Sequence, residues 1–369
     1  MIKGGQKTPI KCNVAVTGLD CTENPYPGLS VLRSIKESGE FEGKIIVLTY
    51  DCLATGLYQH DLVDEVYMIP YPSEPEEFLF SRISEINTKA KIDVIIPCLD
   101  SEISTYARLA QRLRGLGISV LAPWEDGVKA RSKLFLAEFC KKNDIDYPKS
   151  FLIYDANEID NYAAVLHYPL MIKGSIIDSA KASNAAEAHV YFNQLATMWG
   201  LPLIIQENLD GEEYDVAVLA DQESNIVAKV AMRKIGITRR GKAFAGVTVD
   251  SRQFDALAEK VVKALQWQGP LEIEIMRNSD LNRQYIIEIN ARFPTWIYTT
   301  LGANLNLPLL HVKLALGQKI GTLPAYKKGV MFARVVEDAY CNLNYLAQLN
   351  LKGEIDWIKS KKINPDLLA

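Results

Sequence analysis

The sequence predicts an α/β domain with a doubly wound parallel sheet, followed by an α+β domain. Three observations lead to this fold class. Short apolar runs alternate with helical segments through the first third of the chain, as in a parallel sheet covered on both faces. From Pro169 onwards the strand candidates come in antiparallel pairs, which cannot extend that first sheet. Residues 269–276 and 285–294 then alternate with period two around a polar connection, which predicts a hairpin.

In the first domain, each strand candidate is a short apolar run that fits a buried parallel strand. The five runs are residues 13–18, 44–49, 66–69, 93–97 and 119–122. Helical spacing of apolar residues fills the segments 29–37, 74–87 and 102–113. This alternation predicts a doubly wound domain that ends near residue 125.

The second part of the chain begins with a predicted helix at 126–143 and an exit segment at 144–148. Strand candidates follow at 170–173, 203–207, 213–220, 226–234 and 244–249. A predicted helix at 251–267 leads into the hairpin, and a further strand candidate at 330–336 precedes a polar tail. The mixture of antiparallel strands and helices implies a second domain.

Length and composition exclude several classes of protein. The 369 residues suffice for two or three domains with a sizeable core. An apolar fraction of 48% with 23% charged residues is typical of a soluble enzyme. The net charge of -4 gives no reason to expect a nucleic acid or a membrane as partner. No apolar stretch approaches membrane-spanning length and no signal-peptide pattern opens the chain, so we expect a cytoplasmic protein.

Cysteine and histidine usage argues against several kinds of site. The six cysteines are scattered without a CxxC pair, unlike those of a zinc ribbon or a disulfide framework. The four histidines form neither an HExxH motif nor a close metal pair. Because no nucleophile motif is present either, a Ser-His or Cys-His mechanism is not expected.

The predicted hairpin carries the most informative side chains. If its register centres on residue 281, Glu274 lies opposite Glu288 and Glu272 lies opposite Asn290. Carboxylates that face each other repel, so the arrangement suggests a hard cation such as magnesium between them. Arg292 lies on the same face and suits phosphate. A hairpin with one solvated face is the alternative, and the coincidence of Glu, Glu, Asn and Arg in one register disfavours it.

Two upstream segments suit a nucleotide, although the chain has neither a GxxxxGKS/T nor a GxGxxG motif. Lys173 ends an apolar strand, where a buried charge is costly unless an anion meets it, and a small polar run at 174–183 follows. The segment 202–216 passes from an apolar strand to a polar hinge and then to acidic residues, which suits adenine and ribose. A solvated lysine and a hairpin turn are the alternatives for these segments taken singly.

The order of these motifs resembles that of the ATP-grasp superfamily, in the branch that includes carbamoyl-phosphate synthetase large subunits and carboxylate-amine ligases. The resemblance covers roughly residues 12–316. It rests on Ser132-Lys133, Met171–Gly174, Ile205–Leu209, Gly211–Tyr214, Leu271–Glu274 and Ile287–Arg292. It implies a pre-ATP-grasp domain at 1–125, followed by an ATP-grasp domain that binds ATP between two subdomains. The implied small subdomain is 126–205, the large subdomain is 206–320, and an extension at 321–369 would pack on the ATP-grasp domain.

The resemblance also assigns roles to individual residues. Those implied to bind the nucleotide are Lys133, Lys173 and Ser175 at the phosphates, Gln206, Glu207 and Leu209 at adenine, and Glu213 at the ribose. Those implied to coordinate Mg2+, or Mn2+ in its place, are Glu274, Glu288 and Asn290. Arg292 would stabilise the transferred phosphoryl group.

The activity that this resemblance implies is that of an ATP-dependent ligase. Transfer of the γ-phosphoryl group would turn a carboxylate into an acyl phosphate, and an amine would then displace phosphate. The products would be an amide or peptide bond, ADP and phosphate. The substrates would be a small carboxylate and an amine, such as an amino acid or a peptide, and a homo-oligomer is compatible with this activity.

Three alternatives to this ligase stay open. One is an ATP-grasp enzyme with a non-amine acceptor, which would form a carboxyphosphate or a thioester. Another is a nucleotide-binding regulator without catalysis, which would not need every polar residue of the hairpin. The last is a NAD-linked dehydrogenase, which the missing glycine fingerprint disfavours.

The substrate end of the site is less well marked in the sequence. Arg233 falls within the strand candidate 226–234, so we expect it to contact the acyl phosphate or the substrate carboxylate. The nearby Arg239, Arg240 and Lys242 fit a solvated hairpin tip.

Two other segments have more than one interpretation. Asp100 and Ser101 are expected to cap the helix that follows them, and Glu102 has a substrate role as its alternative. Phe293 and Trp296 fit an acceptor pocket and packing between domains equally well.

Overall fold

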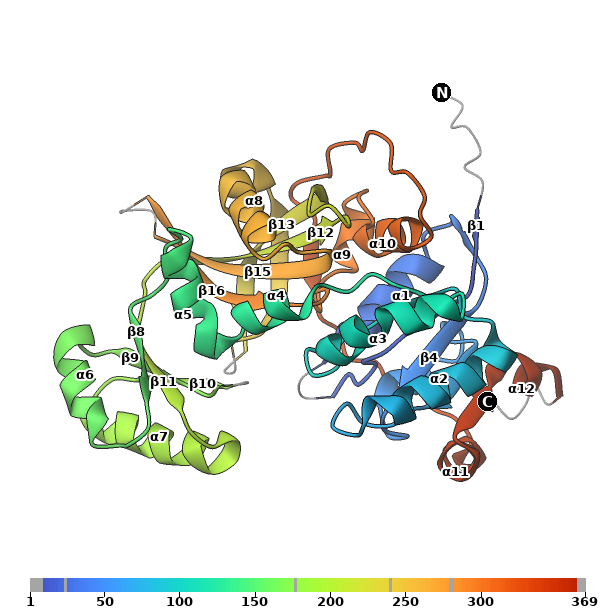
Figure 1. Cartoon of the computed structure of the whole chain (residues 1–369), viewed down its shortest axis with the longest axis horizontal. Helices are drawn as coiled ribbons and strands as arrows, with labels where there is room; N and C mark the ends of the chain where they lie inside the picture. Colours follow the sequence, from blue (N-terminus) through green and yellow to red (C-terminus); the bar gives the residue numbers. More distant parts are fainter. Residues whose placement is uncertain (1–8, 23–24, 176–177, 239–240, 279–281, 364–369) are drawn as a thin grey trace.

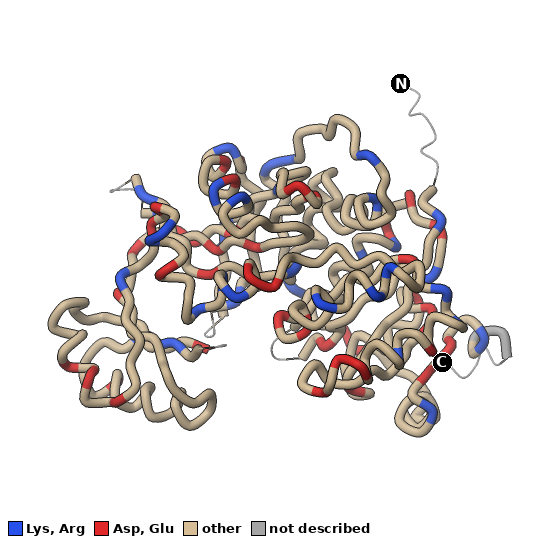
Figure 2. Tube along the Cα trace, in the orientation of Figure 1, with Lys and Arg blue, Asp and Glu red and all other residues tan. Residues whose placement is uncertain are grey.

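The computed structural model of the chain describes residues 9–22, 25–175, 178–238, 241–278 and 282–363. An N-terminal α/β domain is followed by a second part with two antiparallel sheets (Figure 1). This arrangement confirms the predicted fold class. Acidic and basic residues are mixed along the whole trace rather than separated into large patches of one sign (Figure 2).

The first domain contains a six-stranded sheet in the order β18-β5-β4-β2-β6-β7. Its parallel strands are β2 (Val14–Val16), β4 (Ile45–Thr49), β5 (Glu65–Met68), β6 (Val94–Ile96) and β7 (Ser119–Val120). The helices beside it are α1 (Gly28–Lys36), α2 (Glu76–Ala90) and α3 (Ile103–Gly115). The five strands and three helices therefore occur where the sequence predicts them. Two short strands, β1 (Ile10–Lys11) and β3 (Phe41–Glu42), pair separately.

Burial on both faces explains why these strands are continuously apolar. Ile45 and Val47 of β4 pack in one cluster with residues of α1, whereas Ile46 and Leu48 pack on the opposite side with residues of α2 and α3. Successive side chains of a strand point to opposite faces, so both faces are covered.

The connection to the second part is two helices, α4 (Glu125–Ala130) and α5 (Lys133–Lys142), rather than the single predicted helix. Ser132 has an extended backbone, with φ -63° and ψ 149°, and this conformation ends the continuous helix. Lys133 consequently lies in the first turn of α5.

A four-stranded antiparallel sheet follows in the order β10-β9-β11-β8. Its strands are β8 (Ser150–Ile153), β9 (Leu170–Lys173), β10 (Ser179–Ala182) and β11 (Leu203–Glu207). One face of the sheet packs on α6 (Glu158–Leu166) and α7 (Ala185–Trp199). The opposite face carries both Lys173 and Gln206. Lys173 pairs with Ile204, which lies two residues before Gln206 on β11, and residues two apart on a strand point to the same face.

The larger antiparallel sheet has the order β16-β15-β12-β13-β14-β17. Its strands are β12 (Glu212–Ala220), β13 (Ile226–Ile237), β14 (Ala243–Val249), β15 (Gly269–Asn278), β16 (Arg283–Asn290) and β17 (Met331–Ala333). The predicted helix at 251–267 divides into a 3-10 turn, η2 (Ser251–Phe254), and α8 (Asp255–Ala264), which packs on one face. The short helix α9 (Thr299–Gly302) and α10 (Leu307–Ala315) follow the hairpin.

The end of the chain corrects one expectation. The extension was expected to pack on the second domain, and β17 does pair with β14. However, α11 (Leu343–Lys352) and β18 (Glu354–Asp356) pack on the first domain, where β18 adds an antiparallel strand to β5. Tyr345 and Trp357 supply apolar anchors within this otherwise polar segment, and their rings contact each other. A final helix, α12 (Trp357–Ile363), follows, and no helix in the described ranges is long and apolar enough to cross a membrane.

Candidate active site

In the half that lies away from its turn, the hairpin has the register that the sequence predicts. Glu272 pairs with Asn290, and Glu274 pairs with Glu288. A bulge follows, after which Ile275 pairs with Ile286. The Asn290 amide donates to Glu272 at 3.1 Å and to Glu274 at 3.0 Å. The polar face of the hairpin is therefore a connected network, and its turn residues 279–281 lie outside the described residues.

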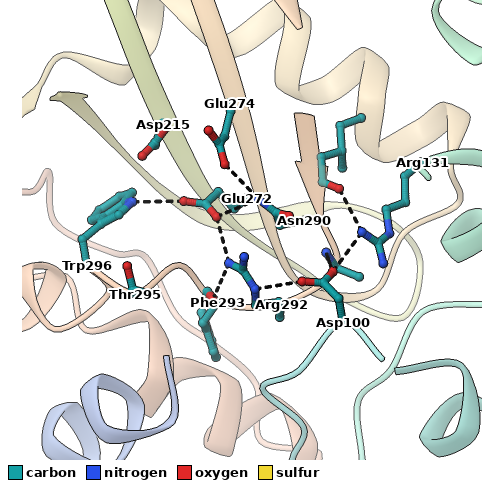
Figure 3. A network of polar contacts seen from close by, with 12 residues as sticks. Asp100, Arg131, Asp215, Glu272, Glu274, Asn290, Arg292, Phe293, Thr295 and Trp296 are labelled. Atoms are coloured by element: carbon teal, nitrogen blue, oxygen red, sulfur yellow. Dashed lines mark hydrogen bonds and ion pairs between the residues drawn. The ribbon is translucent and has the colours of Figure 1, made fainter. Parts of the chain in front are cut away.

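A third strand adds a carboxylate that the sequence did not predict for the site. Asp215 of β12 lies opposite Glu274 of β15. Side-chain oxygens of Asp215, Glu272 and Glu274 lie within 4.8 Å of one another (Figure 3). Asp215 is only 2% exposed. Strands β12 and β15 are far apart in the sequence, so period-two alternation could not reveal this pairing.

Lys234 neutralises these carboxylates. Its Nζ lies 2.8 Å from Glu274, 3.2 Å from Asp215 and 3.3 Å from Glu213. Burial alone would lower the pKa of Lys234, but the surrounding carboxylates outweigh burial and raise its pKa well above the usual value. Lys234 is therefore a charged, buried counterion.

The prediction for Arg233, which precedes Lys234 on β13, is corrected by the structure. Its side chain lies on the opposite face of β13 from Lys234, because successive residues alternate. There it forms an ion pair of 2.6 Å with Glu212, and its side chain is 44% exposed. Arg233 therefore lies on the face of the sheet away from the acidic network, whereas the expectation placed it at the acyl phosphate or the substrate carboxylate.

The three carboxylates differ in how readily they lose a proton. Burial, together with the charges of Glu274 and Glu272, raises the pKa of Asp215 despite Lys234. Burial also raises the pKa of Glu272, although Arg292 opposes it. For Glu274 burial acts in the same direction, but Lys234 outweighs it and the pKa is lowered. Negative charge is therefore held most firmly on Glu274, which pairs with Glu288.

Arg292 joins the hairpin to the first domain. Its Nη1 donates to Glu272 Oε2 at 2.9 Å, and its Nε donates to Asp100 Oδ2 at 3.1 Å (Figure 3). Trp296 Nε1 donates to the other oxygen of Glu272 at 3.2 Å, and its ring is buried. Phe293 is also buried in the core, so packing describes both aromatic residues.

The predictions for Asp100 and Glu102 are corrected. Asp100 does not cap α3, which begins at Ile103 after Glu102. The Glu102 carboxylate is fully buried and accepts the backbone N–H groups of Cys98 and Leu99, at 2.7 and 2.9 Å. It also accepts the hydroxyls of Thr17 and Tyr50, so these contacts leave it no open side toward a substrate.

Two lysines approach the hairpin from outside its sheet. Lys133 Nζ lies 3.6 Å from Glu288 Oε2. Lys173, at the end of β9, is 9% exposed. Burial and then the charge of Lys133 lower the pKa of Lys173 to about 8, while Glu288, Glu274 and Glu213 act in the opposite direction. The structure thus brings these predicted residues into one electrostatic group.

The predicted adenine residues lie on β11 and just beyond it. Gln206 is 2% exposed, and its amide nitrogen has no hydrogen-bond partner within the described part of the chain. The Glu207 N–H donates to the Lys149 carbonyl at 2.9 Å, and its carboxylate accepts from the Lys149 N–H at 2.6 Å. Leu209 is half-buried, as is Ser175, which precedes the undescribed residues 176–177.

Two cations near Arg292 form no ion pair within the described ranges. Arg334 donates to Thr295 Oγ1 at 2.9 Å, and burial lowers its pKa. Burial, followed by the charge of Arg292, lowers the pKa of Lys242 to about 8. Lys242 was expected at a solvated hairpin tip, and its partial burial corrects that expectation; its neighbours 239–240 lie outside the described residues.

Comparison with known proteins identifies relatives of this chain. Residues 201–338 match the family model described as "ATP-grasp in the biosynthetic pathway with Ter operon". The carbamoyl phosphate synthase large chain of Campylobacter jejuni subsp. jejuni is 25% identical over 296 residues, which is 75% of this chain and 26% of that protein. The chain therefore spans about a quarter of the length of the curated relatives it matches.

Two solved structures show the same fold at low sequence identity. The biotin carboxylase domain of 2-oxoglutarate carboxylase from Hydrogenobacter thermophilus aligns with a TM-score of 0.63 at 17% identity, covering 84% of this chain and 71% of that one. L-amino acid ligase from Bacillus licheniformis aligns with a TM-score of 0.60 at 16% identity, covering 82% and 74%. The family match and the likeness to the carbamoyl phosphate synthase large chain support the ATP-grasp superfamily, in the branch that resembles that large chain, and the two solved structures show the same fold.

Proposed function

We propose that this chain is an ATP-dependent ligase that activates a small carboxylate as an acyl phosphate. One observation carries the proposal. Glu274 and Glu288 face each other in the hairpin, Asn290 completes their polar face, and Lys133 and Lys173 approach from outside that sheet. Opposed carboxylates beside two lysines suit a metal-bound polyphosphate, in which both signs of charge are present.

The nucleotide would lie between the two antiparallel sheets. Lys133, Lys173 and Ser175 would hold the phosphates. The base would meet Gln206 and the backbone of Glu207 and Leu209, and Glu213 would bind the ribose. Support comes from the buried, unpaired amide nitrogen of Gln206, which lies on the same face of its sheet as Lys173. Support also comes from the aligned biotin carboxylase domain, which was solved with MgADP.

The donor set fits a magnesium ion, with manganese as an alternative. Glu274, Glu288 and Asn290 offer oxygen ligands, which hard divalent cations prefer. Glu288 has only a distant cation, Lys133 at 3.6 Å, among its described ion-pair contacts. When bound, such an ion neutralises the phosphate oxygens and makes the transfer of the phosphoryl group easier.

The protein's own residues would contribute positioning and charge. Arg292 would hold the transferred phosphoryl group, while Lys234 would keep Asp215 and Glu274 in place. Lys242 and Arg334 would receive the substrate carboxylate, because both are partly buried and neither forms an ion pair within the described ranges.

The acceptor that completes the reaction is proposed to be an amine, such as that of an amino acid or a peptide. The likeness to an L-amino acid ligase supports this class of acceptor. The alternative is a non-amine acceptor, which includes enzymes that form carboxyphosphate. It is supported by the biotin carboxylase domain, solved with bicarbonate, and by the carbamoyl phosphate synthase relatives.

The proposed function is tested by incubating the protein with ATP, Mg2+ and pooled carboxylates and amines, and following phosphate, pyrophosphate and product mass. We expect ADP, phosphate and a condensed product. Bicarbonate alone as the productive carboxylate would favour the alternative. Release of pyrophosphate would contradict the acyl phosphate, and tight ATP binding without any turnover would indicate a regulator.

Substitution of the opposed carboxylate supplies the first site prediction. Glu288→Gln should lower Mg2+-dependent turnover by at least about 100-fold, because the ion loses a charged ligand. The matched control is Glu212→Gln, which lies on the other face of the sheet beside Arg233. Circular dichroism should show both variants folded, and wild-type turnover in Glu288→Gln would remove Glu288 from the metal site.

A further inference from the structure

Asp100 is part of the first domain, but its side chain contacts residues that follow the hairpin. It follows β6, at the carboxyl end of the parallel sheet. Its carboxylate nevertheless accepts hydrogen bonds from Arg292 Nε at 3.1 Å and from the Ala291 N–H at 3.4 Å, and forms an ion pair with Arg131 Nη1 at 2.9 Å (Figure 3). The two hydrogen-bond donors follow Asn290, at the end of the proposed metal motif.

These contacts fix the plane of the Arg292 guanidinium. Asp100 holds its Nε, while Glu272 and the Phe293 carbonyl hold its Nη1 at 2.9 and 3.1 Å. A guanidinium is rigid and planar, so two anchored nitrogens determine where the third points. Nη2 has no partner among the described residues and is left for an anion.

Arg131 extends the same anchorage to the start of α5. Its Nη1 donates to the Ile289 carbonyl at 3.2 Å and also meets Asp100. Arg131 precedes Lys133 by two residues, within the break between α4 and α5. Burial would raise the pKa of Asp100, but the charges of Arg131 and Arg292 outweigh it and keep the pKa below its usual value. The Asp100 carboxylate therefore lies between the two arginines and pairs with both.

A bridge that only joined two domains would not need this geometry. Arg131 alone links Asp100 to β16 through Ile289. The additional bond from Asp100 to Nε of Arg292 constrains a side chain that otherwise has one carboxylate partner, Glu272. This hydrogen bond therefore serves to orient the Arg292 side chain more than to attach the first domain to the hairpin.

We propose that Asp100 is a positioning residue through which the first domain orients Arg292 toward the phosphoryl group. The inference rests on the proposed ligase function. Phosphoryl transfer would then depend on the first domain, although Asp100 itself would not touch ATP. Binding of the nucleotide base and ribose would not depend on Asp100.

The kinetic test compares Asp100→Asn with wild type, using the substrates that give turnover. Asparagine keeps the size and one acceptor oxygen but removes the charge. We expect kcat to fall about 10- to 100-fold while KM for ATP changes less than about threefold. Asp100→Glu should be less impaired. The control is Asp93→Asn, which lies at the other end of β6, where its carboxylate accepts the Asn13 N–H at 2.7 Å.

Combination with Arg292→Lys shows whether Asp100 acts through Arg292. If it does, adding Asp100→Asn to Arg292→Lys should lower kcat by less than about twofold further, because the two effects are not independent. Additive losses, or a raised KM at unchanged kcat, would overturn the inference. A fall in thermal stability that Asp93→Asn reproduces, together with equal loss of activity, would make Asp100 a purely structural contact.

A measurement without turnover separates this inference from the proposed function. In protein labelled with 15N-arginine, the Nε–H resonance that disappears in Arg292→Lys should shift in Asp100→Asn and stay in place in Asp93→Asn. An unshifted resonance would overturn the positioning role alone. Absence of any ATP-dependent product in the wild type, with the shift observed, would overturn the ligase function and leave the contact intact.

Discussion

Adjacent residues on β13 have opposite electrostatic situations. The side chain of Lys234 is 4% exposed and meets three carboxylates, whereas that of Arg233 is 44% exposed and, among the described residues, pairs with Glu212 alone. An exposed ion pair is screened by water and contributes little to stability. Removal of one partner from a buried network leaves uncompensated charge in the interior, which is much more costly.

We therefore predict unequal effects for the two substitutions. Lys234→Met should lower the free energy of unfolding by about 3–5 kcal/mol, and Arg233→Met should change it by less than about 1 kcal/mol. Urea denaturation followed by circular dichroism measures both. Adding Asp215→Asn to Lys234→Met should recover part of the loss, because it removes one of the unpaired charges. Equal, small changes in the two single variants would show that Lys234 is not the counterion.

At the scale of elements, a strand is easier to predict from the sequence when both of its faces are buried. Strands β2, β4 and β6 are apolar throughout because both of their faces are covered, so the sequence predicts them directly. The sequence misses β10 and β18, which are edge strands of three or four residues whose pairing depends on distant segments. Helical spacing alone does not predict the break at Ser132, since the contacts of Arg131 with Asp100 and Ile289 are tertiary. The resemblance, which implies that Ser132-Lys133 opens a helix, does predict it, and the start of α5 confirms this.

The element-scale prediction concerns the anchor of β18. Trp357 is fully buried beside Tyr345, so Trp357→Ala should lower the free energy of unfolding by about 3–5 kcal/mol. Amide hydrogen exchange should also accelerate in β5, which pairs with β18. Trp124→Ala is the matched control, because that side chain is 62% exposed and its loss should change stability by less than about 0.5 kcal/mol. Similar effects of the two substitutions would contradict the packing of β18.

At the scale of the whole molecule, the candidate site is assembled from separate units. The order of motifs along the chain predicts the group formed by Lys133, Lys173, Glu274 and Glu288. The contact between Asp100 and Arg292 could not be predicted, because it depends on how the first domain is placed against the hairpin. The choice of Lys234 over Arg233 depends on the phase of a strand that period-two alternation leaves undetermined.

The stability of the whole fold should depend on pH through His311 of α10. His311 is fully buried, neither ring nitrogen has a hydrogen-bond partner in the described chain, and burial lowers its pKa to about 4. In the unfolded chain a histidine has a pKa of about 6.5, so between these values the unfolded state binds more protons. This contribution to stability is fully present above pH 6.5 and is lost progressively as the pH falls toward 4.

Urea denaturation at pH 7 and pH 5 tests this dependence. His311→Leu should lose about 2 kcal/mol less than wild type between the two pH values, because leucine takes up no proton in the unfolded state. An identical pH dependence in His311→Leu would exclude His311 as its source.

The strand that borders β5 comes from the far end of the described chain, and this affects folding during synthesis. Residues 65–68 leave the ribosome long before residues 354–356 exist. N-terminal domains commonly fold while the rest of the chain is still being made. Here the first domain must wait with one edge of its sheet unpaired, and an open edge invites pairing with other nascent chains. Until translation reaches Asp356, the edge of β5 has no β18 to pair with.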